Sequence, residues 1–265
     1  MTEKLSRRTL LGGGLALTAG MLAAQEAEAG SYSPEPMAKM AKNKKVVVWS
    51  EGTAPKKVYP DDINTAIAAG LKGLKGFDVS IASLNDPDQG LPADKLATTD
   101  VLIWWGHQKH GDVKDELVQA IVKRVKEDGM GFIATHSAHY SKALKAVLGT
   151  NCGWKYYIDD GAKVDLVVTA PSHPIAKGIK NFTVPHTERY GDPFEVPTPE
   201  AVIFDGIYTL PDGKTGEHAQ QGMVWTVGKG RVFYFQPGHE GYPIYFQEEI
   251  QHIFRNGVEW VSNHK

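Results

Sequence analysis

The sequence predicts an α/β fold in which a mainly parallel, doubly wound sheet carries helices on both faces. Two observations lead to this prediction. Continuous apolar runs such as KVVVW (45–49) and DVLIWW (100–105) are typical of strands buried on both faces of a parallel sheet. Segments with apolar residues at helical spacing follow these runs, and such a βαβαβα order favours right-handed crossovers.

Each element of the first half follows from its local pattern. The strands are β-branched or aromatic runs, and the helices carry an apolar stripe, which is clearest where Val113, Leu117, Ile121 and Val125 recur every fourth residue. The expected order is strand 45–49, helix 61–75, strand 77–82, strand 100–105, helix 113–126, strand 130–135 and helix 139–148.

The second half is richer in strands. Strands are expected at 164–169, 201–208, 223–227 and 231–236, with turns at Pro-Asp-Gly (211–213) and Gly-Lys-Gly (228–230). The apolar stripe of residues 245–261 predicts a closing helix.

The first 29 residues resemble a twin-arginine export signal. Arg7 and Arg8 precede an apolar stretch, and Ala-Glu-Ala (27–29) supplies a small-x-small cleavage site. An uncleaved membrane anchor is the alternative, but the stretch 10–24 is shorter than the roughly 20 residues that span a bilayer. We therefore expect signal 1–29, a flexible tether 30–43 and one domain 44–265, in a protein that is periplasmic or otherwise exported.

Composition excludes several classes of protein. The signal segment holds three basic and three acidic residues, so the formal net charge of −2 is unchanged by its removal. Such a balance predicts no nucleic-acid partner and no stable membrane insertion after cleavage. The single cysteine, Cys152, excludes an intrachain disulfide. The sequence makes no prediction of oligomeric state.

Histidines gather where expected strands run out into loops. The four segments are WGHQKH (105–110), THSAH (135–139), HTERY (186–190) and PGHE (237–240). Because the carboxyl ends of parallel strands converge on one crevice, these side chains are predicted to form a site.

Several separated motifs resemble the trehalose-utilisation (ThuA-like) family. They are DVLIWWGH (100–107), GFIATHSAHYSK (131–142), GTNC (149–152), HPIAKG (173–178), YGDPF (190–194) and FYFQPGHE (233–240). The resemblance runs from about residue 46 to the C-terminus. It implies a class I glutamine amidotransferase-like fold, that is, a flavodoxin-like three-layer sandwich with a mainly parallel sheet.

The chemistry departs from that of an amidotransferase. Such an enzyme needs a cysteine at the turn between a strand and the following helix, but this turn holds His136 followed by Ser137. His107 occupies the loop that usually forms the oxyanion hole, and His239 with Glu240 stands where the activating histidine and glutamate would come. An amidase using Ser137 is a third possibility, disfavoured because Ser137 lies one position late.

A divalent transition metal is the cofactor hypothesis for His107, His136 and His239. Three neutral imidazoles with an open fourth position are typical of catalytic zinc, and manganese, iron or nickel would also fit. The alternative is that each histidine bonds a sugar hydroxyl or a backbone carbonyl, because the spacing is not a compact metal motif.

The resemblance implies a small carbohydrate substrate such as a glycoside or 3-keto-glycoside. Proton abstraction with elimination, hydrolysis and isomerisation all remain open, and the competing class is a non-catalytic sugar-binding protein. The predicted catalytic residues are His139, Glu188 and Glu240. For Glu188 and Glu240 the alternative is a solvent-exposed carboxylate in a loop, without a catalytic role. The predicted substrate-binding residues are Trp105, His110, Tyr190 and Tyr242.

Overall fold

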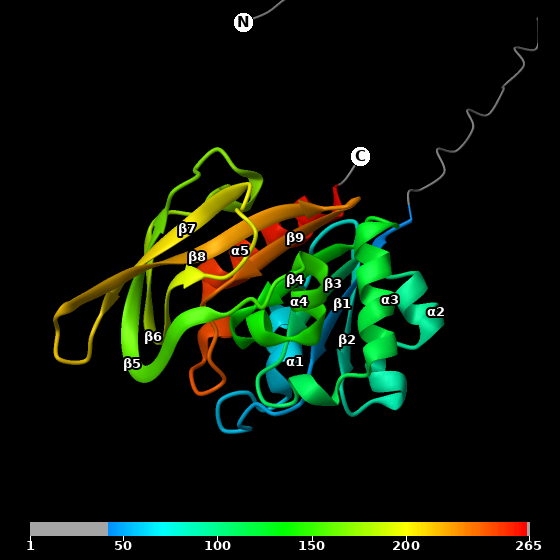
Figure 1. Cartoon of the computed structure of the whole chain (residues 1–265), viewed down its shortest axis with the longest axis horizontal. Coiled ribbons are helices and arrows are strands. Elements are labelled where there is room, and N and C mark those ends of the chain that lie inside the picture. Colours follow the sequence, from blue (N-terminus) through cyan, green and yellow to red (C-terminus); the bar gives the residue numbers. More distant parts are fainter. Residues whose placement is uncertain (1–41, 264–265) are drawn as a thin grey trace, which may run out of the picture. The chain divides into compact units, whose positions relative to one another are not determined.

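The computed structural model describes residues 42–263, in which nine strands form a single sheet in the order β2-β1-β3-β4-β9-β8-β7-β5-β6 (Figure 1). The predicted export signal, its cleavage site and almost the whole predicted tether lie outside the described residues. Export and a periplasmic location therefore stay predictions. None of the helices in the described part of the chain combines the length and apolarity needed to cross a membrane.

One half of the sheet is parallel. All four pairings between its five strands run in the same direction, and the central strands are buried along almost their whole length. These strands are β1 (Lys44–Ser50), β2 (Phe77–Ser83), β3 (Val101–Trp105), β4 (Gly131–Thr135) and β9 (Gly230–Phe235). The apolar runs of the sequence form this half because both of their faces are covered.

Helices cover both faces of the parallel half. Helices α1 and α5 pack on one face, over residues such as Val48 and Ile133, while α2, α3 and α4 lie on the side of Leu102 and Phe132. Three layers result, as expected for an amidotransferase-like fold. The bounds are α1 (Asp62–Gly70), α2 (Ala93–Ala97), α3 (Asp115–Lys126), α4 (Lys142–Leu148) and α5 (Glu248–Ser262).

The other half of the sheet is antiparallel, which corrects the expectation of a mainly parallel sheet. Four pairings join β9 to β8, β8 to β7, β7 to β5 and β5 to β6, and these strands are longer than the parallel ones. Figure 1 shows much of β5 to β8 extending beyond the helices. Their bounds are β5 (Trp154–Val168), β6 (Phe182–Phe194), β7 (Ala201–Thr209) and β8 (Thr215–Val227).

Short connections account for two of the antiparallel pairings, β7 with β8 and β8 with β9. Only residues 210–214 separate β7 from β8, and residues 228–229 separate β8 from β9. A parallel pairing needs a crossover of a dozen or more residues, so such short turns can only form hairpins. Both turns were predicted from the sequence. The prediction of a mainly parallel sheet was wrong because these turns make the strands on either side antiparallel.

Two predicted helices are divided or shorter. The segment 139–148 is a tight 3₁₀ turn over His136–Tyr140 followed by α4, and 245–261 is a 3₁₀ turn over Ile244–Phe246 followed by α5. Strand β6 was not predicted. The segment 186–190, which was expected in a loop at a strand end, lies inside this strand. Helix α2 was also missed, because five residues carry too little periodicity.

Candidate active site

Three histidines gather at the carboxyl edge of the parallel strands. His107 stands two residues after β3, His136 directly follows β4, and His239 stands four residues after β9. The ring centroids of His136 and His239 lie 5.8 Å apart, and those of His107 and His239 lie 5.9 Å apart. The topology thus brings together side chains that are more than a hundred residues apart in the chain.

His136 occupies the sharp turn between β4 and the following 3₁₀ segment. Its φ of 53° lies in the left-handed region, which most side chains avoid and which is common at strained functional turns. The ring is fully buried. Its Nδ1 lies 2.9 Å from the backbone carbonyl oxygen of Gln236, and since a carbonyl only accepts, Nδ1 carries a proton.

The other ring nitrogen of His136 faces two ionisable groups. Nε2 lies 3.1 Å from Oε2 of Glu188 and 3.2 Å from the hydroxyl of Tyr190. An imidazole lone pair facing a carboxylate would be repulsive, so the pair must share a proton. Burial acts to raise the pKa of Glu188, but the hydrogen bond and charge of His136 outweigh it and hold that pKa below its ordinary value. The arrangement is that of a buried histidine and a buried carboxyl group in direct contact.

Tyr190 completes this group as a neutral phenol. Burial, followed by the charge of Glu188, raises the pKa of Tyr190 well above its ordinary value. Its ring stacks on His136 with centroids 4.8 Å apart. The hydroxyl therefore stays protonated and available as a hydrogen-bond donor at neutral pH.

A second histidine–glutamate pair lies beside the first. Nε2 of His107 is 3.1 Å from Oε1 of Glu240. Among residues 42–263, neither Nδ1 of His107 nor Oε2 of Glu240 has a hydrogen-bond partner, although both atoms are buried. Such atoms carry a desolvation penalty until water, a ligand or a small movement satisfies them, as is common at binding sites.

His239 has a third carboxylate near it. Its Nε2 is 3.7 Å from Oδ2 of Asp159, and Tyr242 donates its hydroxyl hydrogen to Oδ1 of Asp159 at 2.9 Å. Nδ1 of His239 accepts from the backbone N–H of Gly241 at 2.9 Å. Asp159 lies in β5, so the antiparallel half of the sheet closes the site from one side.

Two further histidines are held neutral. Burial lowers the pKa of His139 to about 3, against an opposing hydrogen bond in which Nδ1 donates to the carbonyl oxygen of Cys152 at 2.6 Å. Its Nε2 is therefore unprotonated above about pH 4. Burial also lowers the pKa of His110 to about 4, although the charge of Glu51 opposes the shift.

A cavity of about 280 Å³ opens beside these groups. Two exposed tyrosines, Tyr140 and Tyr157, lie in its wall with 55% and 69% of their surface accessible. The full lining is His107, His110, Ser137, His139, Tyr140, Tyr157, Glu188 and Tyr190. The cavity thus combines titratable groups with aromatic faces, which suits a small polar ligand with an apolar side.

The three predicted metal ligands each lie near a carboxylate in the structure. In the stretch 42–263, no three histidine, cysteine, aspartate or glutamate side chains are grouped so that they could hold one. The Nε2 atoms of His107 and His136 each face a glutamate instead. Metal binding at His107, His136 and His239 stays a prediction, and the geometry carries no chemical step through a metal.

Among the predicted substrate contacts, His110 and Tyr190 line the cavity, while Trp105 and Tyr242 do not. Trp105 is fully buried in β3 and its ring stacks behind His107, with centroids 6.4 Å apart. It was predicted to contact the substrate, with core packing of Trp104 or Trp105 as the alternative. Both tryptophans are buried, because helices cover both faces of this part of the sheet. Tyr242 lies against Asp159 and His186.

Sequence reasoning missed two carboxylates of the site. Glu51 directly follows β1, so the rule that found the histidines could have found it as well. Asp159 sits in the middle of a long irregular strand and offered no such signal.

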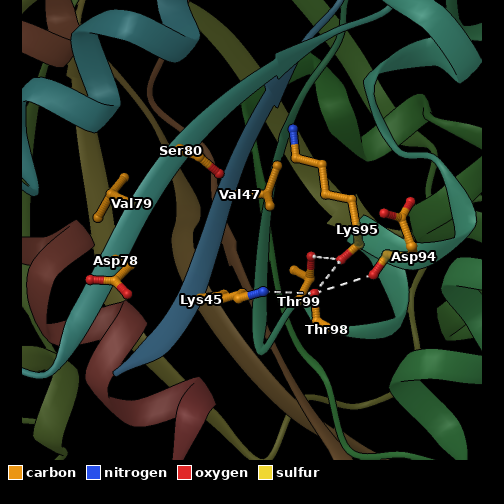
Figure 2. A pocket seen from close by; sticks show the side chains of 9 residues that line it. All are labelled: Lys45, Val47, Asp78, Val79, Ser80, Asp94, Lys95, Thr98 and Thr99. Atoms are coloured by element: carbon orange, nitrogen blue, oxygen red, sulfur yellow. Dashed lines mark hydrogen bonds between the residues drawn. The ribbon is translucent and has the colours of Figure 1, made fainter. Parts of the chain in front are cut away.

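A larger cavity of about 390 Å³ lies elsewhere, at the starts of the parallel strands (Figure 2). Lys45 and Asp78 are the second residues of β1 and β2, and the ammonium of Lys45 donates to Oγ1 of Thr98 at 3.0 Å. No histidine lines this cavity. Size alone therefore does not locate the chemistry, and the histidine-lined cavity is the candidate active site.

The fold is similar to that of solved ThuA-like proteins and of a glutamine amidotransferase. A protein from Bacteroides uniformis described as ThuA-like is 19% identical, with 86% of this chain and 95% of that one covered at a TM-score of 0.61. Another from Parabacteroides merdae is 16% identical, covering 83% and 90% at 0.62. A glutamine amidotransferase from Thermotoga maritima is 14% identical, covering 83% and 98% at 0.50. These likenesses show the fold.

The sequence profile of the trehalose-utilisation family, ThuA, matches residues 45–261. The chain therefore belongs to the ThuA family, and the resemblance seen in the sequence is confirmed. No curated protein matches it.

Two residues of the described chain could be considered as nucleophiles, Cys152 and Ser137. His136 occupies the turn after β4, where the sequence resemblance predicts the position of an amidotransferase cysteine, and Cys152 is buried elsewhere. Ser137 donates its hydroxyl hydrogen to the backbone carbonyl of Gly106 at 2.7 Å, so this serine serves as a structural tie. Neither residue is arranged for attack on an amide.

Proposed function

We propose that this protein is an acid–base enzyme that acts on a small carbohydrate, a glycoside or 3-keto-glycoside, in the cavity beside the histidine cluster. The observation that carries the proposal is the presence of two histidine–glutamate pairs, His136 with Glu188 and His107 with Glu240, each at 3.1 Å. Paired imidazoles and carboxylates are the usual means of moving protons near neutral pH. One member of each pair, Glu188 and His107, lines the cavity.

The chemistry that we propose is removal of a proton next to a carbonyl. In a 3-keto-glycoside, loss of the C2 proton leads to an enolate, from which the C1 aglycone departs by elimination. His139 and Glu188 are the candidate bases; His139 is available unprotonated throughout the physiological range, although its low pKa makes it a modest base. Hydrolysis and isomerisation would use the same first proton transfer or the same pairs.

Tyr190 and Glu240 fit the complementary roles. The hydroxyl of Tyr190 stays protonated and lines the cavity, so it can donate to the oxygen on which negative charge develops. Glu240 is the candidate acid for the leaving group, and its contact with His107 provides a route by which it could receive a proton. The exposed faces of Tyr140 and Tyr157 are suited to stacking on a sugar ring.

A transition metal, zinc or else manganese, iron or nickel, would strengthen such chemistry by polarising the carbonyl. Elemental analysis of the purified protein tests for it. A stoichiometric metal that is lost in His107→Ala and His239→Ala would support the ligand set predicted from the sequence. A metal content equal to that of the buffer would refute the predicted metal site and leave the acid–base proposal intact.

The experiment that tests the function is proton NMR of 3-keto-trehalose incubated with the protein in deuterated water. The C2 hydrogen is expected to exchange or the aglycone to be released. Glu188→Gln should slow the reaction by about 100-fold or more, as expected for loss of an acid–base group. His218→Ala is the matched control, because His218 also faces a carboxylate, Asp205 at 3.3 Å, but lies exposed outside the cavity.

The competing proposal is a sugar-binding protein without catalysis, favoured by the loss of the amidotransferase nucleophile. In that case the sugar would bind and return unchanged, with no deuterium at C2. Glu188→Gln would then weaken binding only. An inert sugar that also fails to bind would refute both proposals.

A further inference from the structure

Glu51 is a buried carboxylate that none of the proposed catalytic steps uses. It directly follows β1, and only 1% of its surface is exposed. Burying a charge is unfavourable unless donors surround it. Here Oε1 accepts from the backbone N–H of Gln108 and from the hydroxyl of Thr53 at 3.0 Å, and Oε2 accepts from the backbone N–H of Lys109 at 3.0 Å.

The two backbone donors belong to the loop that carries His107. This loop leaves β3 and enters a short 3₁₀ turn at His110. The side chain of His107 reaches Glu240 through Nε2, while its Nδ1 has no partner among the residues that the structure describes. The ring of His107 thus contributes one polar contact, and the two backbone amides that follow it contribute the contacts to Glu51.

We propose that Glu51 is a positioning residue of this site: by accepting from two successive backbone amides, it orients the loop so that His107 meets Glu240. Two adjacent amides aimed at one carboxylate define the peptide planes just after His107, and hence the direction in which its side chain leaves the backbone. Hydrogen bonds to a charged acceptor are stronger than neutral ones, which makes the contact effective. The catalytic meaning of this placement rests on the proposed acid–base function.

The same contact keeps these two amides from forming an oxyanion hole. The N–H groups of Gln108 and Lys109 are occupied by an internal carboxylate and are not free to bind a developing negative charge. Glu51 does not line the cavity, so it acts through His107 and not on a substrate.

The test is Glu51→Gln, which keeps the shape but replaces one acceptor oxygen with a donor. Backbone amide hydrogen exchange at Gln108 and Lys109 should become roughly 10- to 100-fold faster, the effect of losing a hydrogen bond to a charged group. Amides of β4 and β9 should keep their rates. The matched control is Asp100→Asn. The carboxylate of Asp100 accepts from the backbone N–H of Lys45 at 2.7 Å, at the start of β1, whereas Glu51 follows the end of β1.

Turnover separates positioning from simple stabilisation. Glu51→Gln should lower kcat about 10-fold or more with little change in KM, because His107 is misplaced while the rest of the cavity is intact; Asp100→Asn should leave both constants unchanged. Unchanged exchange at Gln108 and Lys109, or equal acceleration of every amide in the domain, would overturn the proposal. If wild-type protein turns over no 3-keto-glycoside, the proposed function fails, while the exchange data still decide the role of Glu51.

If Glu51→Gln does not fold, the contact can be tested in the wild-type protein instead. Through-hydrogen-bond couplings from the amide nitrogens of Gln108 and Lys109 to the carboxyl carbon of Glu51 are expected in the wild-type protein. Their absence would refute the contact itself.

Discussion

Replacing His136 by asparagine should convert Glu188 from a stabilising residue into a destabilising one. Asparagine tolerates the left-handed backbone at this position, so the φ of 53° adds little strain. The substitution removes the imidazole that faces Glu188 at 3.1 Å and leaves the carboxyl group buried. Breaking a buried ion pair typically costs 3–5 kcal/mol, and we expect about 3 kcal/mol at pH 7, because 6% of Glu188 remains accessible to water.

The pH dependence gives the prediction its sign. In the wild type the pKa of Glu188 lies below its unfolded value of about 4.3, so its contribution to stability is present above that pH and is lost as the pH falls through the folded pKa. In His136→Asn burial dominates and raises the folded pKa. The contribution is then present below about pH 4.3 and is lost as the pH rises. The stability gap between the two proteins should therefore widen from pH 4 to pH 8.

The assay is urea unfolding followed by tryptophan fluorescence at several pH values between 4 and 8. Glu188→Gln, His136→Asn and the double variant complete a cycle that isolates the pair. Adding Glu188→Gln to His136→Asn should restore about 1–2 kcal/mol at pH 7, because it removes the unpaired charge. A gap that stays constant across the pH range, or a double variant less stable than His136→Asn, would refute the reasoning.

Three other predictions concern single positions. Gly238→Ala should lower the free energy of unfolding by about 2 kcal/mol or more, because the backbone has φ of +148° and an added Cβ would lie 2.0 Å from the hydroxyl of Tyr245. The control is Gly213→Ala, at φ of +81° with open space around it, which should lose less stability in the same urea titration. Equal losses in the two variants would contradict this prediction. Cys152 is fully buried and its pKa is raised by burial, so a thiol reagent at pH 8 should label it only after unfolding; rapid labelling of native protein would show the site to be open. Tyr190→Phe should lower the stability by about 1 kcal/mol, since it removes a buried hydroxyl 3.2 Å from Nε2 of His136, and an unchanged urea midpoint would argue against that hydrogen bond.

Local sequence pattern was sufficient for the parallel half of the fold. The runs at 45–49, 100–105 and 130–135 are mostly apolar, and each forms a strand that is largely buried on both faces. Helix α3 likewise follows from an apolar residue at every fourth position. These elements could be predicted because burial of both faces leaves its signature in consecutive residues.

The antiparallel half could not be predicted in the same way. Strand β6 contains proline, charged and small residues without regular alternation, and it is a strand because β5 pairs with it. Its register decides that Glu188 faces His136. A shift of one residue would turn Glu188 to the opposite face, and nothing local in the segment specifies that choice.

The sequence by itself determined the family, the parallel strands and the placement of His107, His136 and His239 at one edge of the sheet, because strand order and strand ends follow from local pattern and chain connectivity. Only the tertiary structure decided which carboxylate each histidine meets and that Glu51 holds the loop of His107. Those contacts join residues 52 to 133 positions apart, and they depend on strand register and loop geometry, which consecutive residues do not encode.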